Sequence, residues 1–124
     1  MKKFLMLFAF FLTISVTYGQ DIADVQQRSD RTLIAFDSEN REISRMNITE
    51  YEDLSGFSST IIVVTRKDNT VIVYNQEFRE ISRMNITDNE RVKNVSGNNF
   101  IIKRKDGTVI TYDKDCREIS RRNE

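Results

Sequence analysis

The sequence predicts an all-β fold built from antiparallel meander repeats of 38 residues, and three observations carry this prediction. When Thr32, Thr70 and Thr108 are aligned, the chain reads "TLIAFDSENREISRMNIT", "TVIVYNQEFREISRMNIT" and "TVITYDKDCREISRRNE". The apolar runs in these copies are β-branched and aromatic, which favours strands over helices. The chain also contains no proline, as is typical of a chain whose backbone N–H groups mostly join strand ladders.

The first 19 residues have the composition of an export signal. Two lysines precede an apolar run over 4–16, and Thr17 and Gly19 supply the small residues of a cleavage site. The apolar run is shorter than the roughly 20 residues that a spanning helix needs, so an uncleaved anchor is the less favoured alternative. We therefore expect 1–19 to be a signal peptide and the mature chain to be periplasmic or extracellular, with no membrane segment.

Residues 20–124 form the expected β-repeat domain, which divides into a partial repeat at 21–49 and repeats at 50–87 and 88–124. Removal of the signal takes away two lysines and leaves 17 basic and 19 acidic residues. This balance provides no strong positive field, so nucleic acid is not an expected partner. The remaining length is enough for one small domain.

Each repeat is expected to contain four strands joined by tight turns. The first strand lies around 54–57 and 91–95, the second at 61–65 and 100–103, the third at 71–74 and 109–112, and the fourth over "REISR". Asp68-Asn69 and Asp106-Gly107, between the second and third strands, are typical hairpin turns. One such unit has too small a core to fold alone, so the units are expected to stack.

The third strand of each repeat is apolar on both faces. In the middle repeat Ile72 and Tyr74 point to one face, and Val71 and Val73 point to the other. The same alternation recurs in the other two copies. A strand of this kind needs cover on both sides, which again predicts stacked units.

The fourth strand carries the candidate binding residues. Simple alternation would put Arg79, Ile81 and Arg83 on one face, the pattern of an outer strand whose charges discourage further edge pairing. Rows of arginines along the stack could bind carboxylates or sulfated glycans. In the favoured alternative the arginines are structural and pair with acidic residues on the neighbouring strand. The six candidates are Arg41, Arg45, Arg79, Arg83, Arg117 and Arg121.

The segment "RVKNVSGNNFIIKRKDGTVITYDKDCREIS" resembles a β-propeller blade of the WD-repeat type. It has an inner strand that ends in a small-residue loop, an aspartate in the turn before the third strand, and "TVITYD" where such repeats often carry a Trp-Asp ending. Closed propellers use at least four blades, and this chain has fewer than three. The resemblance implies an open array of blades, or a ring completed by further copies of the chain as in some small lectins. A single curved antiparallel sheet is the alternative without blades.

Residue types exclude several kinds of chemistry. The chain contains no histidine, so no Ser/His/Asp or Cys/His catalytic arrangement exists. Acidic or amide residues recur in the turn before the fourth strand, as at Asp37 and Glu39, but the closing glycine and the distant glutamate of a calcium loop are absent. No spacing selects two carboxylates for glycoside hydrolysis. We expect a protein that is not an enzyme and needs no metal or cofactor.

The single cysteine, Cys116, occupies the turn position held by Asn40 and Phe78 in the other copies. Such variety indicates a tolerant, exposed position and an unactivated thiol. An interchain disulfide is the alternative interpretation.

The expected function is that of a small exported, non-catalytic binding or structural module. Its partner would be an unidentified protein or envelope component, bound through an exposed face or edge of the stack. Residues 22–27 form a poorly apolar strand that would leave an edge open for pairing. The alternative is a lectin-like, glycan-binding subunit of a homo-oligomeric propeller.

Overall fold

The computed structural model describes residues 20–123, and the predicted signal peptide lies outside the described residues. The regular structure of the described part consists of strands, and this part contains no helix long and apolar enough to cross a membrane. The strands are β1 Asp24–Gln27, β2 Thr32–Phe36, β3 Glu42–Asn47, β4 Glu52–Phe57, β5 Ile62–Arg66, β6 Thr70–Tyr74, β7 Glu80–Asn85, β8 Glu90–Ser96, β9 Asn99–Arg104, β10 Thr108–Asp113 and β11 Glu118–Asn123.

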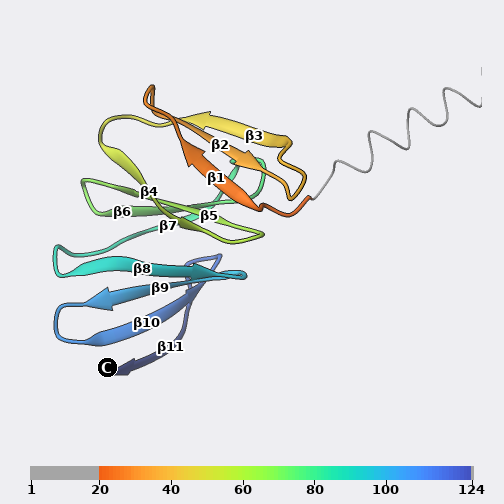
Figure 1. Cartoon of the computed structure of the whole chain (residues 1–124). Helices are drawn as coiled ribbons and strands as arrows, with labels where there is room; N and C mark the ends of the chain where they lie inside the picture. The colour runs from red at the N-terminus through yellow and green to blue at the C-terminus, as the bar shows by residue number, and fades with distance from the viewer. Residues whose placement is uncertain (1–19, 124) are drawn as a thin grey trace, which may run out of the picture.

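The strands form three separate antiparallel sheets. Their orders are β1-β2-β3, β4-β5-β6-β7 and β8-β9-β10-β11, so each strand pairs with its neighbour in sequence. The sheets stack as three successive layers (Figure 1). The predicted blade-like array is confirmed. The alternative of one curved sheet is wrong, because β3 does not pair with β4 and β7 does not pair with β8.

Each sheet has an inner and an outer edge. The inner strands β4 and β8 lie against each other, whereas β3, β7 and β11 form the outer edges (Figure 1). The first sheet has three strands because it begins with the counterpart of β5, and no described strand corresponds to β4. The prediction that "REISR" forms an outer strand is confirmed.

The first apolar core lies between the first and second sheets. Leu33 and Ala35 of β2 face Ile62 and Val64 of β5, and all four side chains are buried. They belong to alternate positions of their strands, so the opposite faces remain for other contacts. The face that the first sheet contributes to this core is opposite, in terms of the repeat unit, to the face that the second sheet contributes.

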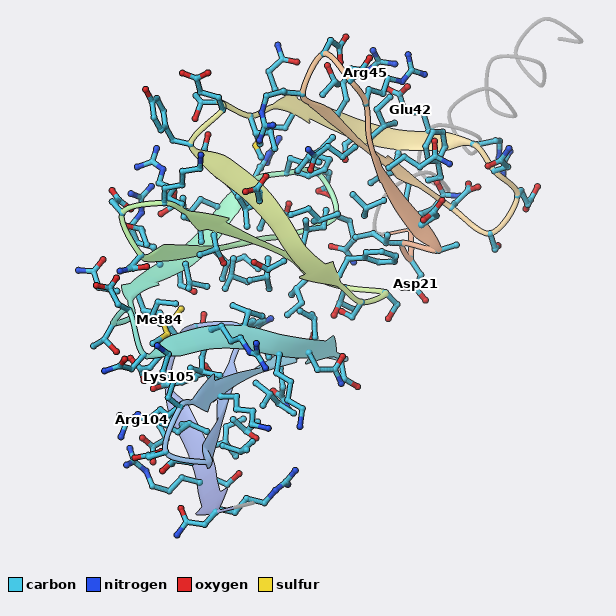
Figure 2. All side chains as sticks on the ribbon, turned by 60° about the vertical axis from the view of Figure 1, so that its left-hand side comes forward. Asp21, Glu42, Arg45, Met84, Arg104 and Lys105 are labelled. Atoms are coloured by element: carbon cyan, nitrogen blue, oxygen red, sulfur yellow. The ribbon has the colours of Figure 1, made fainter. Side chains whose placement is uncertain are left out.

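The second core lies between the second and third sheets. Val71 and Val73 of β6 pack with Phe100 and Ile102 of β9, and Met84 covers the edge of the contact (Figure 2). Strand β6 is therefore covered on both faces, as its two-sided apolar pattern predicts. Both contacts use equivalent positions of the repeat, since Leu33 and Ala35 correspond to Val71 and Val73, and Ile62 and Val64 correspond to Phe100 and Ile102.

The turns between the second and third strands follow their predicted chemistry. Asn69 and Gly107 have positive φ values of 70° and 92°, a conformation that asparagine and glycine adopt more readily than other residues. The carboxylate of Asp68 accepts a hydrogen bond from the backbone N–H of Thr70, at 3.1 Å. The third copy of this turn repeats that contact.

The fourth strand of each sheet contains a bulge that simple alternation does not predict. In the second sheet the register shifts at Ile81, which is skipped in the pairing of β6 with β7. The extra residue turns Glu80 and Arg83 to the same face, while Ile81 packs against the second core. The predicted common face of Arg79, Ile81 and Arg83 is therefore wrong, because the bulge interrupts the two-residue period.

Candidate binding sites

Three of the six predicted arginines form ion pairs within their own strand. The bulge places each one beside the glutamate three residues earlier, and Figure 2 shows the first of these pairs on the outer strand of the first sheet. The partner was expected on the neighbouring strand, so that detail is wrong. The Nε–Oε2 distances are 2.9 Å for Arg45 and Glu42, 2.8 Å for Arg83 and Glu80, and 2.9 Å for Arg121 and Glu118.

The other three arginines follow the turn that leads into the fourth strand. Arg41 lies 3.4 Å from the Asp37 carboxylate and 3.2 Å from that of Glu39. Arg117 repeats both contacts in the third unit. In the second unit an asparagine replaces the first aspartate, so the turn before Arg79 contains one carboxylate fewer.

Local pairing explains the charges of this strand without a ligand. The hydrogen bond from Arg45 lowers the pKa of Glu42 below its usual value, and the carboxylate in turn raises the pKa of Arg45. Both side chains are exposed, and exposed ion pairs contribute little to stability because water and salt screen them. The geometry supports the structural interpretation, and a binding role for the six arginines stays a prediction.

The serine of "REISR" joins each sheet to the next. Ser44 Oγ donates a hydrogen bond of 2.6 Å to the backbone carbonyl of Gln76, and Ser82 Oγ donates one of 2.5 Å to that of Lys114. Both acceptors lie in the turn before the fourth strand of the following unit. Ser120 is the third copy, lies on the last sheet and is exposed. The repeated serine is thus a contact between layers.

Ser82→Ala is expected to lower the free energy of unfolding by about 1 kcal/mol, because the hydrogen bonds of its hydroxyl to Lys114 and Cys116 of the next layer are lost. Ser120→Ala removes the same hydroxyl where no described sheet follows, so it should change stability by less than about 0.5 kcal/mol. Urea unfolding followed by circular dichroism would compare the two variants. Equal effects would show that the serine acts within its own sheet.

The turn residue at positions 40, 78 and 116 contacts the preceding unit. All three copies have positive φ, at 64°, 57° and 60°. Phe78 is buried in the first core and Cys116 packs against the second, whereas Asn40, which no described sheet precedes, is exposed. The residue is apolar where a described layer precedes it and polar in the first described layer.

The prediction of an exposed, tolerant position for Cys116 is therefore wrong. The thiol is half-buried and lies 3.1 Å from Ser82 Oγ. Burial raises the pKa of this thiol above its usual value. The hydrogen bond with Ser82 lowers the pKa but has the smaller effect. A half-buried thiol with a raised pKa reacts slowly. The three different residue types looked like tolerance because each copy meets a different neighbour.

An open backbone edge runs along β1. Gln26 and Ile34 are direct partners, and the N–H of Arg28 donates to the carbonyl of Thr32 at 2.9 Å. In an antiparallel pair the intervening residues direct their N–H and C=O groups to the opposite side. No described strand pairs with that side. In the other two sheets the equivalent groups pair with β4 and β8.

Apolar side chains adjoin the place of the absent strand. Leu54 and Phe57 of β4 are half-buried and pack at the edge of the first core. Their repeat equivalents in β8 are Val92 and Val95, and Val95 is close enough to Gly56 of β4 that a methyl group on the glycine would approach it to 2.8 Å. Phe57 is larger than Val95 and has no inner strand of the first sheet opposite it. The open edge and these two side chains form the candidate peptide site.

Sequence reasoning located the open edge but missed the apolar residues beside it. Leu54 and Phe57 resemble ordinary strand residues when their strand is considered alone. Comparison of positions 57 and 95 would identify these residues. The larger side chain occurs at position 57, where the preceding sheet has no described inner strand. The acidic turns offer no further site: within residues 20–123 no group of three or more Cys, Asp or Glu is arranged to hold a metal ion.

Three stacked antiparallel sheets with inner and outer edge strands define a class: the described chain is an open array of β-propeller-type blades. No family model matches the chain, and no curated protein matches it. Solved structures do resemble it.

BamB from Moraxella catarrhalis is 10% identical, with a TM-score of 0.51 over 82% of this chain and 34% of that protein. Hsv2 from Kluyvelomyces marxianus is 12% identical, with a TM-score of 0.53 over 80% and 42%. A protein of unknown function from Bacteroides caccae is 8% identical, with a TM-score of 0.55 over 78% and 38%. The chain thus spans between a third and about two fifths of the length of these proteins. At such identities the likeness concerns the fold alone.

Proposed function

We propose that this protein is an exported, non-catalytic binding module that takes up an extended segment of a partner protein along β1. The observation that carries the proposal is the open edge of β1, since no described strand takes the place there that β4 and β8 have in the other two sheets. Main-chain hydrogen bonds to an exposed strand edge are a recurrent mode of peptide recognition. A segment bound there would take the position that β4 and β8 have in the other sheets.

The surroundings of the edge support a particular kind of segment. The N–H and C=O groups of Val25 and Gln27 face the open side, so the segment would be extended and antiparallel to β1. Leu54 and Phe57 adjoin it on one face. Apolar residues at alternate positions of the segment would pack on them, with polar residues on the opposite face.

A synthetic peptide with the sequence of residues 49–58, "TEYEDLSGFS", is a suitable probe, because it contains the chain's own inner strand. Amide hydrogen exchange by NMR should show rapid exchange at Gln27 in the mature chain and slow exchange at Gln26. Addition of the peptide should slow exchange at Gln27 and leave Gln26 unchanged. A Gln27 amide that is already protected without peptide, or that does not respond to it, would refute the proposal.

Gln27→Pro removes the backbone donor at the edge, and Gln27→Ala keeps it, so the two variants form a matched pair. Proline is tolerated on an edge strand whose N–H does not serve its own sheet. The proline variant should bind the peptide at least tenfold more weakly than the alanine variant. Equal binding by the two would exclude strand addition at β1.

A lectin-like ring of several chains is less well supported, because it would have to cover both ends of the stack. The outer face of the third sheet carries Arg91, Lys103 and Arg122 where the inner contact has Asp53, Thr65 and Met84. Burial of these three cationic side chains would remove them from water, which opposes such a contact. We expect the mature chain to be monomeric in light scattering, and a dimer or trimer would favour the ring.

A further inference from the structure

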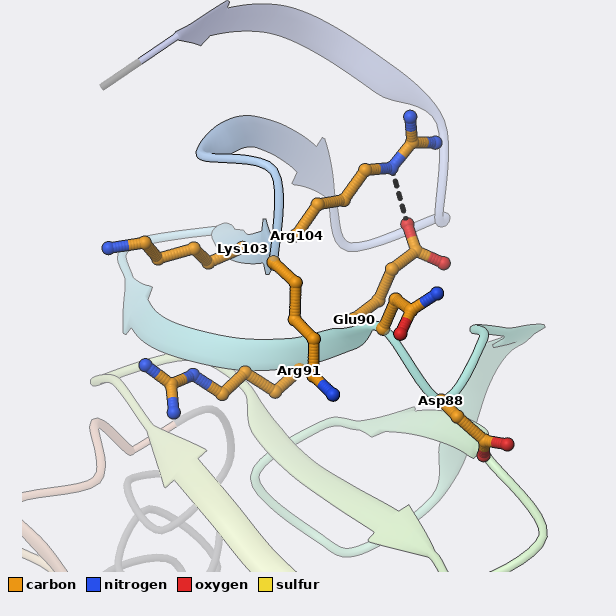
Figure 3. A pocket seen from close by; sticks show the side chains of 7 residues that line it. Asp88, Glu90, Arg91, Lys103 and Arg104 are labelled. Atoms are coloured by element: carbon orange, nitrogen blue, oxygen red, sulfur yellow. Dashed lines mark hydrogen bonds and ion pairs between the residues drawn. The ribbon is translucent and has the colours of Figure 1, made fainter.

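A glutamate begins the inner strand in the second and third sheets. Glu52 of β4 is the direct partner of Arg66, and Glu90 of β8 is the direct partner of Arg104. Arg66 Nε lies 3.2 Å from Glu52 Oε2, and Arg104 Nε lies 2.9 Å from Glu90 Oε2 (Figure 3). Only 10% and 9% of the two glutamate side chains are exposed. The ion pair is therefore a repeated contact between the inner strand and the strand beside it.

A threonine three residues before each glutamate holds its carboxylate in place. The backbone N–H of Thr49 donates to Glu52 Oε1 at 3.0 Å, and that of Thr87 donates to Glu90 Oε1 at 2.9 Å. Burial raises the pKa of each glutamate, but the hydrogen bonds from the threonine and the arginine together outweigh burial, so each pKa lies below its usual value. The pattern Thr-x-x-Glu thus presents an ionised carboxylate to the arginine.

Arg28 has the position of this arginine in the first sheet. It lies 38 residues before Arg66, and its N–H donates to the carbonyl of Thr32 across the turn that ends β1, at 2.9 Å. The glutamate has no such counterpart, because the residue 38 positions before Glu52 is Ile14. The first copy of the repeat therefore contains the arginine of the pair without the matching glutamate.

The side chain of Arg28 has the same acidic neighbours as its two equivalents. The pKa of Glu42 is lowered chiefly by the hydrogen bond from Arg45, and the charge of Arg28 lowers it further. The pKa of Asp30 is lowered chiefly by hydrogen bonds with Thr32, and Arg28 again adds to the effect. The equivalent arginines make the same two contributions, Arg66 to Glu80 and Asp68, and Arg104 to Glu118 and Asp106. These neighbours do not prevent the pair with an inner-strand glutamate in the other two sheets, so they do not prevent it at Arg28.

We propose that the segment bound along β1 is selected by a glutamate that pairs with Arg28, in the pattern Thr-x-x-Glu at the N-terminal end of the segment. This inference rests on the proposed function and specifies the partner. A strand antiparallel to β1 begins beside the C-terminal end of β1, so its first residues meet Arg28 as Glu52 meets Arg66. Charge-assisted hydrogen bonds between arginine and a carboxylate are strong and directional. The pair would therefore fix the register of the segment as well as strengthen its binding.

The peptide "TEYEDLSGFS" contains this pattern, and two variants of it form a matched pair. The peptide "TEYQDLSGFS" replaces the glutamate that is expected to meet Arg28, whereas "TQYEDLSGFS" removes the same charge at the equivalent of the exposed Glu50. In titrations of the mature chain at low salt, "TEYQDLSGFS" should bind about threefold more weakly than the unmodified peptide, because an ion pair at the exposed Arg28 is lost. The control peptide should bind within about 1.5-fold of the unmodified peptide, since distant surface charges are largely screened.

Arg28→Gln in the chain completes a double-mutant cycle with these peptides. The unmodified peptide and "TEYQDLSGFS" should bind this variant equally, because neither can form the pair. Equal binding of the two peptides to the unmodified chain, or a difference that persists in Arg28→Gln, would overturn the role of the glutamate. Thermal unfolding would verify that the variant remains folded.

Amide exchange at Gln27 separates this inference from the proposed function. Slower exchange at Gln27 on addition of the unmodified peptide, together with the loss of affinity in "TEYQDLSGFS", is the expected result. Slower exchange at Gln27 without any preference for the glutamate would refute the glutamate pair and leave strand addition at β1 intact. No change at Gln27 would refute the proposed function itself.

Discussion

Phe100→Ala is expected to lower the free energy of unfolding by about 3–5 kcal/mol, the range for removal of a fully buried aromatic side chain. The ring has no exposed surface and lies in the second core. It also stacks on Tyr112, with ring centroids 5.5 Å apart and planes at 19°. Chemical denaturation followed by circular dichroism would measure the loss.

Phe100→Ile is the matched control for that variant. The first sheet-to-sheet contact uses Ile62 at the equivalent position, and Ile62 is also fully buried. Isoleucine should therefore cost less than about 1.5 kcal/mol at position 100. A loss below 1 kcal/mol in Phe100→Ala would show that the third sheet does not pack on the second through this residue.

The same variant tests how far the layers unfold together. Stability in a stack of repeats is approximately a sum of unit terms and contact terms. Loss of the Phe100 side chain weakens the contact between the second and third sheets. The first sheet does not contact this residue. Amide exchange should accelerate more in β9 and β10 than in β2. Uniform acceleration would mean that the three sheets unfold as one unit.

Gly56→Val is expected to cost about 3 kcal/mol, the upper part of the usual range for overpacking. A Cβ atom at Gly56 would lie 2.8 Å from Cγ2 of Val95, an atom with little freedom to move, and valine adds two further methyl groups. Asn94→Val is the control, because position 94 is the repeat equivalent on the exposed outer face. Its effect should stay within about 0.5 kcal/mol.

A double-mutant cycle would assign the cost to one contact. Val95→Ala alone creates space, and Gly56→Ala alone fills it, so the double variant should be more stable than the sum of the two single effects predicts. Thermal unfolding of the four proteins provides the coupling energy. A coupling energy near zero would contradict close packing of β4 on β8.

Most of the fold prediction was based on the 38-residue repeat period. One 38-residue offset located the strands and the turns, since Asp68-Asn69 and Asp106-Gly107 recur between the same apolar runs. The bulge at Ile81 could not be predicted, because strict alternation assumes that no residue is inserted in the ladder. The ion pairs of Arg45, Arg83 and Arg121 depended on that bulge. Their outer position was therefore predictable, but their partners were not.

The candidate sites lie where the three copies differ. Residues that are the same in all three copies make the contacts that every layer makes. Residues that differ lie where one described layer lacks a neighbour that the other layers have. Asn40 against Phe78 and Met84 against Arg122 are differences of this kind. The sequence contains this signal, but its physical meaning depends on knowing which face meets which layer.

The unlike faces that meet in each contact give the molecule a direction. A contact between identical faces would make the two ends of a stack equivalent, whereas here the first sheet presents one face of the repeat unit and the third sheet presents the opposite face. With sheets about 10 Å apart, the first and third layers are separated by about 20 Å. The two ends of the described stack therefore differ in chemistry, and the β1 edge belongs to the first sheet alone. A partner bound along β1 would leave the outer face of the third sheet uncovered.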